Sequence, residues 1–174
     1  MIIALIGNSG TGKSTLTETL VNNFNYISPN HITTRKKRKD DNGFYKYVSQ
    51  EIFDIMRENN EFYVCSGEKN HSYGVEKKEI NSLIRAKKNI VINISIKDLP
   101  NIDKNDDLFI LQMKYRHYIF DFFNNKNIKK LGWKELIRRF LINTKDTIKY
   151  RYYIKDMVDY NIIFNDCNRR ISND

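Results

Sequence analysis

A glycine-rich run near the N-terminus has the residue types and spacing of a phosphate-binding loop. Residues 7–14 read GNSGTGKS and match the pattern G-x-x-x-x-G-K-[ST] at every position. Glycines let successive backbone N–H groups turn towards one anion, and a helix that begins after the loop adds its positive end. Lys13 could reach the β- and γ-phosphates of a nucleoside triphosphate, and the Ser14 hydroxyl could bind Mg²⁺. The loop predicts a nucleoside triphosphate and leaves the phosphoryl acceptor open.

A second group of residues, further along the chain, could bind another phosphate. Arg35 and Arg38 are three residues apart, close enough for both guanidinium groups to contact one phosphate, and arginine suits such bidentate contacts. The Tyr45 hydroxyl could donate to the same group. The alternative is that residues 35–39, which read RKKRK, are only a solvated charged run. The residues alone leave both interpretations open.

The elements around the loop are typical of a parallel α/β fold. Met1–Ile6 is an uninterrupted apolar run, as in a strand buried on both faces, and Ser14–Phe24 has apolar residues at helical spacing. With residues 7–12 as a loop, they form the first unit of such a fold. The same patterns predict strands at Tyr45–Val48, Glu61–Cys65, Ser72–Gly74, Asn89–Ile94, Leu108–Met113 and Asn161–Phe164, and helices at Ser49–Asn59, Glu76–Lys87, Tyr115–Phe123 and Trp133–Tyr150.

Three of these helices carry more detailed expectations. Ser49 is placed to cap the helix that follows it. The helix over Glu76–Lys87 is expected to face inward through Ile80, Leu83 and Ile84. The last helix shows an i, i+3, i+4, i+7 apolar stripe, which predicts a buried face. That stripe consists of Trp133, Leu136, Ile137, Phe140, Leu141, Thr144 and Ile148.

Composition narrows the class of protein. The chain has 174 residues, of which 40% are hydrophobic, which is enough for one domain with a real core and excludes a disordered chain. Thirty Lys and Arg against 21 Asp and Glu give a net charge of +9, which favours anionic ligands such as nucleotides. Two cysteines without a CxxC pair and the lack of a long apolar run favour a cytoplasmic protein that crosses no membrane. Nucleic acid is a weaker option, because no motif that reads it is present.

Taken together, these motifs resemble those of the guanylate kinase family. Further similarities beyond the loop and the TTRKKR run are, in order, NNEF at 59–62, Tyr73-Gly74, the strand 89–95, the pair Arg138-Arg139, and NIIFND at 161–166. The resemblance extends from Ile2 to about Asp166. It implies a three-layer P-loop kinase fold, in which a parallel sheet is flanked by helices. It also implies an enzyme that uses Mg²⁺ and transfers the γ-phosphate of ATP to GMP or dGMP, giving GDP or dGDP.

The resemblance also implies a role for individual residues. Lys13 and the loop would hold ATP, and Arg138 and Arg139 would neutralise charge on the transferred phosphoryl group. The ATP-binding residues would be Asn8, Ser9, Gly10, Thr11, Gly12, Lys13, Ser14 and Thr15, with Ser14 at the metal. The acceptor-binding residues would be Thr34, Arg35, Arg38, Tyr45, Tyr73, Asn93, Ser95 and Asn165, of which Arg35 also acts in catalysis and Asn165 orients an arginine.

The chain departs from the family pattern where guanine is read. Val64 stands where the family has a glutamate that accepts from guanine, and Val75 stands where it has a serine. A ligand donor that loses its hydrogen-bond acceptor in this way commonly loses ~1–3 kcal/mol of binding free energy. We therefore expect weak guanine preference, which Val64→Glu would sharpen, unless Glu68, Asp40 or Asp41 substitutes. Another nucleoside monophosphate as acceptor remains an alternative.

Part of the chain is also similar to ribose 1,5-bisphosphate phosphokinase. That family shares the fold, has Val after Tyr-Gly, as at Val75, and has Asn-x-Ser where guanylate kinases have Asp-x-Asp, as at Asn93 and Ser95. Its acceptor is a phosphorylated sugar without a base. Asn42-Gly43 and Tyr45 favour guanylate kinase instead. A non-catalytic nucleotide-binding module is a further alternative. Such modules typically lose the phosphate loop, whereas this chain keeps Lys13 and Ser14.

The resemblance divides residues 1–174, one domain, into three regions. The core would comprise 1–25, 88–114 and 152–174. The acceptor-binding subdomain would comprise 26–87, and a helical lid 115–151. We expect ATP and GMP, or a related phosphorylated acceptor, as small-molecule partners, and a protein that is a monomer or a homodimer.

Overall fold

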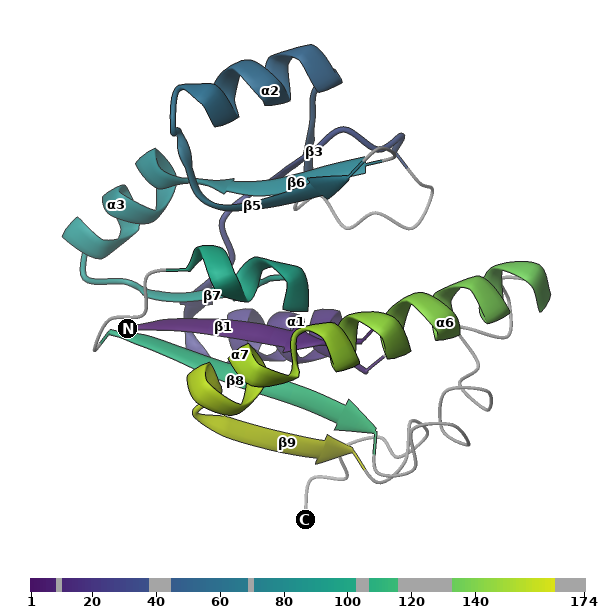
Figure 1. Cartoon of the computed structure of the whole chain (residues 1–174). Coiled ribbons are helices and arrows are strands. Elements are labelled where there is room, and N and C mark those ends of the chain that lie inside the picture. The colour runs from purple at the N-terminus through teal and green to yellow at the C-terminus, as the bar shows by residue number, and fades with distance from the viewer. Residues whose placement is uncertain (9–10, 38–44, 69–70, 103–106, 116–132, 165–174) are drawn as a thin grey trace.

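A computed structural model describes residues 1–8, 11–37, 45–68, 71–102, 107–115 and 133–164. The chain forms two sheets, one above the other in Figure 1, with short helices between them. Within the described ranges, no helix is long and apolar enough to cross a membrane.

The larger sheet is parallel and carries the phosphate loop. Its strands are β1 (Ile2–Gly7), β2 (Tyr26–Ile27), β7 (Asn89–Asn93), β8 (Leu108–Tyr115) and β9 (Tyr160–Phe164), in the order β2-β7-β1-β8-β9. On one face, Leu5 packs with Leu16 and Leu20 of α1 (Lys13–Phe24). On the other face, Ala4 packs in a cluster with Leu99 of η1 (Ile96–Asn101) and Ile154 of α7 (Arg151–Met157). The result is the three-layer P-loop kinase fold that the sequence predicts.

The smaller sheet is inserted between β2 and β7. It consists of β3 (His31–Thr33), β4 (Tyr45–Tyr47), β5 (Phe62–Glu68) and β6 (His71–Glu76), in the order β4-β3-β6-β5. Helix α2 (Gln50–Glu58) covers it through Phe53, whose ring stacks on Phe62 at 4.5 Å between centroids. The Ser49 hydroxyl accepts from the Ile52 N–H at 3.2 Å, which confirms the predicted cap. Helix α3 (Lys77–Arg85) leads back to the parallel sheet.

Helix α6 (Trp133–Lys149) contacts the phosphate loop and η1. It runs along the front of the parallel sheet in Figure 1, below the smaller sheet. The Thr147 hydroxyl lies 3.5 Å from Asn8 Oδ1 in the phosphate loop, and Asp146 lies 3.5 Å from the Lys97 ammonium of η1. One helix therefore contacts both the loop and the residues below the smaller sheet.

Two predicted buried faces are confirmed only in part: in α3, Ile80 is buried and Leu83 packs against the core, but Ile84 is not buried. Ile84 is 47% exposed, because α3 has only nine residues and buries Ile80 alone completely. In the α6 stripe, Leu141 and Ile148 are more than 60% exposed, because the described part of α6 packs mainly on η1 and α7 rather than on a sheet. The side chains of Trp133 and Leu136, and the predicted helix over residues 116–123, lie outside the described residues. Tyr115, predicted to begin that helix, ends β8.

The sequence did not predict four other elements, because each is too short to show a recognisable pattern. The strands β2 and β3 have two and three residues, η1 is a single stretch of 3₁₀-helix, and α7 has seven residues. The remaining predicted strands and helices are confirmed within a few residues of their ends.

Candidate active site

The phosphate loop begins where β1 ends, and two glycines shape it. Gly7 has φ 148°, and a Cβ atom there would lie 2.5 Å from the Met113 carbonyl oxygen of β8. Gly12 has φ 86°, a left-handed conformation that glycine adopts at little cost, and α1 begins at the next residue. The loop can therefore turn tightly from the strand into the helix N-terminus, whose backbone N–H groups attract anions.

Lys13 lies folded over the loop. Its ammonium donates to the carbonyl oxygens of Gly7 at 2.6 Å and Asn8 at 3.0 Å. Burial lowers the pKa of Lys13 from 10.5 to about 8. The Asn8 carbonyl also accepts from the Thr11 hydroxyl at 2.8 Å, which closes the turn. A charged amine therefore sits at the loop, held by backbone carbonyls that a phosphate can replace.

The rest of the predicted ATP-binding set lies at the start of α1 or outside the described residues. Ser14 and Thr15 are exposed in the first turn of the helix, whereas Ser9 and Gly10 are not described. Mg²⁺ takes one or two protein oxygens and completes its shell with phosphate oxygens and water, so an exposed hydroxyl after the loop fits it. In the part of the chain that the structure describes, no group of three or more His, Cys, Asp or Glu side chains could hold a metal by itself.

Two predicted acceptor-binding residues, Arg35 and Tyr45, are in contact. The Arg35 guanidinium carbon lies 4.6 Å from the Tyr45 ring centroid and 5.7 Å from that of Tyr47, a cation–π arrangement. Arg35 is only 6% exposed, and its Nη1 donates to the Lys36 carbonyl at 3.0 Å. A buried arginine held between two rings is not part of a solvated run. Arg38 lies outside the described residues, so its place beside Arg35 stays a prediction.

Thr34 and Asn93, also predicted to bind the acceptor, form internal hydrogen bonds. The Thr34 hydroxyl accepts from the Ser72 N–H at 2.9 Å and so joins the end of β3 to β6. The Asn93 side-chain Oδ1 accepts from the Thr17 hydroxyl at 3.1 Å and joins β7 to α1. Both residues therefore stabilise the scaffold. Asn165 lies outside the described residues.

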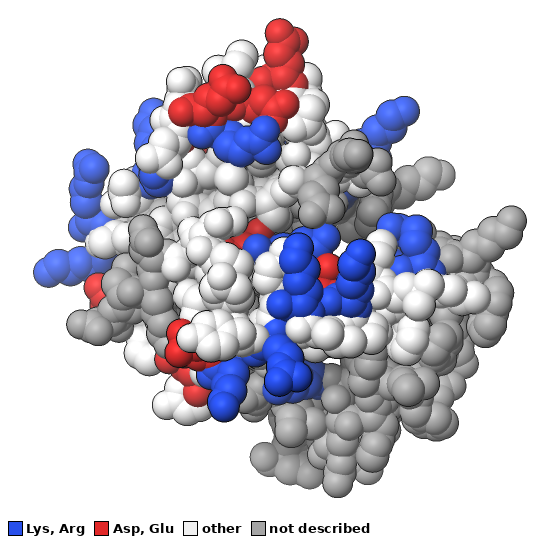
Figure 2. Space-filling view, in the orientation of Figure 1, with Lys and Arg blue, Asp and Glu red and all other residues white. Residues whose placement is uncertain are grey.

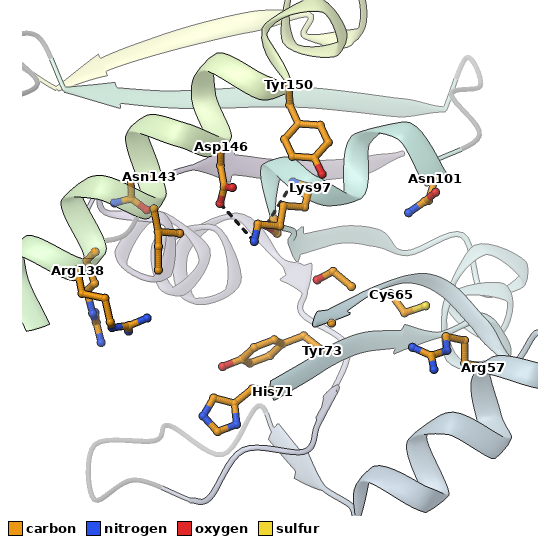
Figure 3. Close-up of a pocket in the computed structure, with 15 residues that line it drawn as sticks. Arg57, Cys65, His71, Tyr73, Lys97, Asn101, Arg138, Asn143, Asp146 and Tyr150 are labelled. Atoms are coloured by element: carbon orange, nitrogen blue, oxygen red, sulfur yellow. Dashed lines mark hydrogen bonds and ion pairs between the residues drawn. The ribbon is translucent and has the colours of Figure 1, made fainter. Parts of the chain in front are cut away.

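A cavity of about 730 Å³ lies between the smaller sheet, η1 and α6. Four residues of the predicted site line it: Tyr73, Ser95, Arg138 and Arg139. They come from three elements far apart in the sequence, which the fold brings to one place (Figure 3). Arg35 and Tyr45 are not among its described lining residues.

The cavity has a basic lining. Arg57, Lys97, Arg138 and Arg139 contribute cations, against the single acidic side chain of Asp146 among the described lining residues. Asp146 pairs with Lys97 at 3.5 Å, and Arg57 pairs with Asp54 of its own helix at 2.6 Å. Figure 2 shows Lys and Arg side chains gathered over the middle of this face, whereas Asp and Glu gather over α2 at the top. Such a lining suits a phosphorylated ligand.

Val64 and Val75, which replace polar residues of the family, lie in the hydrophobic core. They stand opposite each other in the β5–β6 pair and are 4% and 1% exposed. Their cluster also contains Ile80, Ile94 and Leu99. The position of the family's guanine-reading glutamate is therefore filled by packed apolar side chains. The suggested substitutes Asp40 and Asp41, and the side chain of Glu68, lie outside the described residues.

Sequence reasoning missed three charged residues that line the cavity, and a buried one, Asp98, that does not. Arg57 and Lys97 line it, Asp146 faces Lys97, and Asp98 lies buried beside them in η1. The spacing Ser95-x-x-Asp98 was a detectable signal, because it forms a capping box at the start of η1. The positions of Arg57 and Asp146 depend on how α2 and α6 pack, which no local pattern encodes.

Comparison with known proteins agrees with this geometry. The guanylate kinase family model matches residues 1–111. The guanylate kinase of Malacoplasma penetrans is 30% identical over 144 residues, 74% of each chain, and that of Helicobacter pylori is 30% identical over 156 residues, 86% of this chain and 69% of the other. The guanylate kinase of Onion yellows phytoplasma is 31% identical over 108 residues, 60% of this chain and 51% of the other. The chain thus spans about half the length of the phytoplasma relatives that it matches.

A solved structure shows the same fold. The crystal structure of guanylate kinase from Anaplasma phagocytophilum superposes with a TM-score of 0.66 and 19% identity, over 96% of this chain and 78% of that one. At this identity, the similarity establishes the fold alone. The family model covers more than half of the chain, and relatives along most of its length agree with it, so this protein belongs to the guanylate kinase family.

Proposed function

We propose that the chain transfers the γ-phosphate of ATP to GMP or dGMP, giving GDP or dGDP. The observation that carries the proposal is the position of α6. Thr147 of this helix contacts the phosphate loop, and Arg138 and Arg139 of the same helix line the cavity beside the smaller sheet. Cations between a triphosphate site and an acceptor site are what phosphoryl transfer needs, because charge on the transferring group must be stabilised.

The residues divide the work as follows. Lys13 leaves the Gly7 and Asn8 carbonyls and binds the β- and γ-phosphates of ATP, with the loop N–H groups and the α1 N-terminus around them. Ser14 is the protein ligand of Mg²⁺, which neutralises phosphate charge when bound. Arg138 and Arg139 neutralise charge on the transferring phosphoryl group, and Asn165 orients Arg139.

The acceptor phosphate is held on the smaller sheet. Arg35 acts with Arg38, Tyr45 and Tyr73, and the stack of Arg35 on Tyr45 fixes the guanidinium in place. Ser95 contributes a hydroxyl at the cavity, whereas Thr34 and Asn93 act through the strands that they join.

The chain works as one domain with three regions. Residues 1–25, 88–114 and 152–174 form the core, 26–87 bind the acceptor, and 115–151 form the lid. The Cys65 thiol has no disulfide partner among the described residues, which suits a reducing, cytoplasmic location. The protein would act there as a monomer or homodimer.

A phosphorylated sugar is the second candidate acceptor. The specific observation in its favour is the packing of Val64 and Val75 into the core, which removes the family's means of reading a base. The test is an ADP-release assay with ATP and Mg²⁺ across GMP, dGMP, AMP, UMP, CMP and ribose 1,5-bisphosphate. GMP or dGMP should give the highest kcat/KM, and a clear preference for ribose 1,5-bisphosphate would replace the first candidate with the second.

A further inference from the structure

An ion pair joins two walls of the cavity. The Asp146 carboxylate of α6 lies 3.5 Å from the Lys97 ammonium of η1, and both residues line the cavity (Figure 3). Their side chains are 19% and 31% exposed, so the pair is partly shielded from solvent. The roles proposed above use neither residue, although both stand at the cavity that carries the two arginines of α6.

The Lys97 end of the pair belongs to a fixed part of the fold. The Ser95 hydroxyl accepts from the Lys97 N–H at 3.3 Å, and Asp98 Oδ2 accepts from the Ser95 N–H at 2.7 Å, which together cap η1. Leu99 of the same segment is fully buried in the main core. The ion pair therefore ties α6 to a segment whose own position is set by capping and burial.

The arginines of α6 lie beyond this tie, on a thinly packed stretch of the helix. Arg138 and Arg139 precede Asp146 by about two turns, or roughly 11 Å at 1.5 Å per residue. Between them, Leu141 and Ile142 are 61% and 38% exposed, so this stretch buries little apolar area. The direction of the helix therefore depends strongly on the contacts near Asp146.

A small rotation at the tie would displace the arginines by a distance that matters for the reaction. Because a helix moves as a stiff rod, a rotation of about 5° would move a point roughly 11 Å away by about 1 Å. A misplacement of about 1 Å can slow an enzymatic reaction about 10²-fold. Thr147, the residue after Asp146, lies 3.5 Å from Asn8 Oδ1, so the tied end of α6 is also the end next to the phosphate loop.

We propose that Asp146 is a positioning residue: its ion pair with Lys97 holds the two arginines of α6 where phosphoryl transfer requires them. This inference rests on the proposed function and adds a residue that acts through the arginines rather than on the substrates. Partly exposed ion pairs contribute little to stability, so the effect should appear in activity rather than in unfolding. It should appear in kcat, because loss of an interaction made in the transition state lowers kcat, whereas loss of a ligand contact raises KM.

Two single variants test the proposal. Asp146→Ala and Lys97→Met each break the pair, and alanine and methionine both suit a helix. We would measure kcat, the KM for ATP and for GMP in the presence of Mg²⁺, and urea unfolding. Each variant should lower kcat at least tenfold and change both KM values by less than threefold. The urea midpoint should stay within about 0.5 M of wild type.

The reversed pair, Asp146→Lys with Lys97→Asp, distinguishes an ion pair from two independent side chains. It restores the attraction with the charges exchanged, so kcat should return to within threefold of wild type. If the reversed pair does not fold, the double variant Asp146→Ala with Lys97→Met replaces it. Its loss of kcat should be no greater than that of either single variant, because both break the same contact.

Asp54→Asn is the matched control. Asp54 also pairs with a residue of the cavity wall, Arg57 at 2.6 Å, but both belong to α2, so their pair joins no two walls. This variant should keep kcat within twofold of wild type. The proposal is overturned if Asp146→Ala keeps kcat within twofold, if the reversed pair is no more active than the single variants, or if the losses multiply in the double variant.

Binding and acceptor measurements separate this inference from the proposed function. Calorimetric titration with GMP and with ATP should give affinities within threefold for wild type and Asp146→Ala. A tenfold weaker affinity would overturn the proposal, because the pair would then act on a ligand. Wild-type protein that phosphorylates ribose 1,5-bisphosphate instead of GMP replaces the acceptor, and the same variants are then measured with that acceptor. Wild-type protein that transfers phosphate to neither contradicts the proposed function, and the role of Asp146 with it.

Discussion

Among single residues, Lys13 has the most direct link to activity. Its ammonium is held by two loop carbonyls, and we propose that it binds the ATP phosphates. We expect Lys13→Ala to lower kcat by about 10²–10³-fold or more, since losing one group that stabilises transition-state charge has effects of this size. Steady-state kinetics of ADP release would measure it. Lys78→Ala, an exposed lysine of α3, is the control and should keep wild-type turnover. Near wild-type turnover of the Lys13 variant would remove this residue from the ATP site.

Arg35 should affect both the acceptor and stability. Arg35→Ala should raise the acceptor KM far more than the KM for ATP, because the proposed phosphate contact exists in the ground state and the transition state alike. Loss of the stack on Tyr45 should also cost about 1–2 kcal/mol of unfolding free energy. Kinetics and urea titration would measure the two effects, with Arg85→Ala of α3 as the exposed control. Equal changes in both KM values would contradict the assignment.

Asp98 predicts a distinct pH dependence of stability. Its folded pKa of about 6 lies above the ordinary value of 3.8, so between these values the folded protein binds the extra proton and loses stability as pH rises. Relative to wild type, Asp98→Asn should gain on the order of 2 kcal/mol between pH 4 and pH 7. The buried His31, with its pKa lowered to about 4, has the opposite slope, but it is common to both proteins and cancels. Urea titrations at the two pH values would measure the difference, and a constant difference would contradict the buried charge.

What the sequence reveals at this scale depends on whether a residue acts within a local motif. Gly7, Gly12 and Lys13 belong to a contiguous pattern whose backbone requirements identify it. The burial of Asp98 belongs to no local pattern, because it arises only when β5 packs on η1.

At the scale of elements, the pairing of β5 with β6 changes the expected effect of a substitution at Val64. The sequence favours Val64→Glu as a change that sharpens guanine preference. In the structure, Val64 faces Val75 and packs in the main core, so a glutamate there would bury an unpaired carboxylate. We now expect a loss of about 3 kcal/mol or more of unfolding free energy. Thermal and urea unfolding would show it, with the isosteric Val64→Thr as a milder comparison. A Val64→Glu protein of wild-type stability would mean that position 64 faces the acceptor after all.

The elements differ in how well local patterns predict them. The buried strands β1, β7 and β8 are long apolar runs, and α1 and α2 have clear starts, so all five are predicted closely. The strands β2 and β3 are too short for a period to show, and η1 contains Pro100 and has no helical stripe. The apolar residues of α6 misled the prediction, since a periodic stripe shows that a face could be buried and not that a partner covers it.

In the whole molecule, the site is formed by parts that are distant in the sequence. The loop follows β1, the residues that we propose to bind the acceptor lie mainly on the inserted sheet, and the two arginines come from α6. The sequence predicts the parallel sheet and the inserted unit, because the first strand–loop–helix unit and the change of pattern after it are local. It does not predict the cavity, because its walls meet only through contacts such as Lys97 with Asp146.

The measurement that tests the central claim most directly is the fate of the γ-phosphate. Purified protein is incubated with Mg²⁺, GMP and ATP labelled at the γ-phosphate, and the nucleotides are separated by chromatography. The account predicts labelled GDP formed in equal amount to ADP, absent without GMP and reduced by about 10²-fold or more in Lys13→Ala. ADP released with label only in free phosphate, or label on no acceptor at all, would contradict the account.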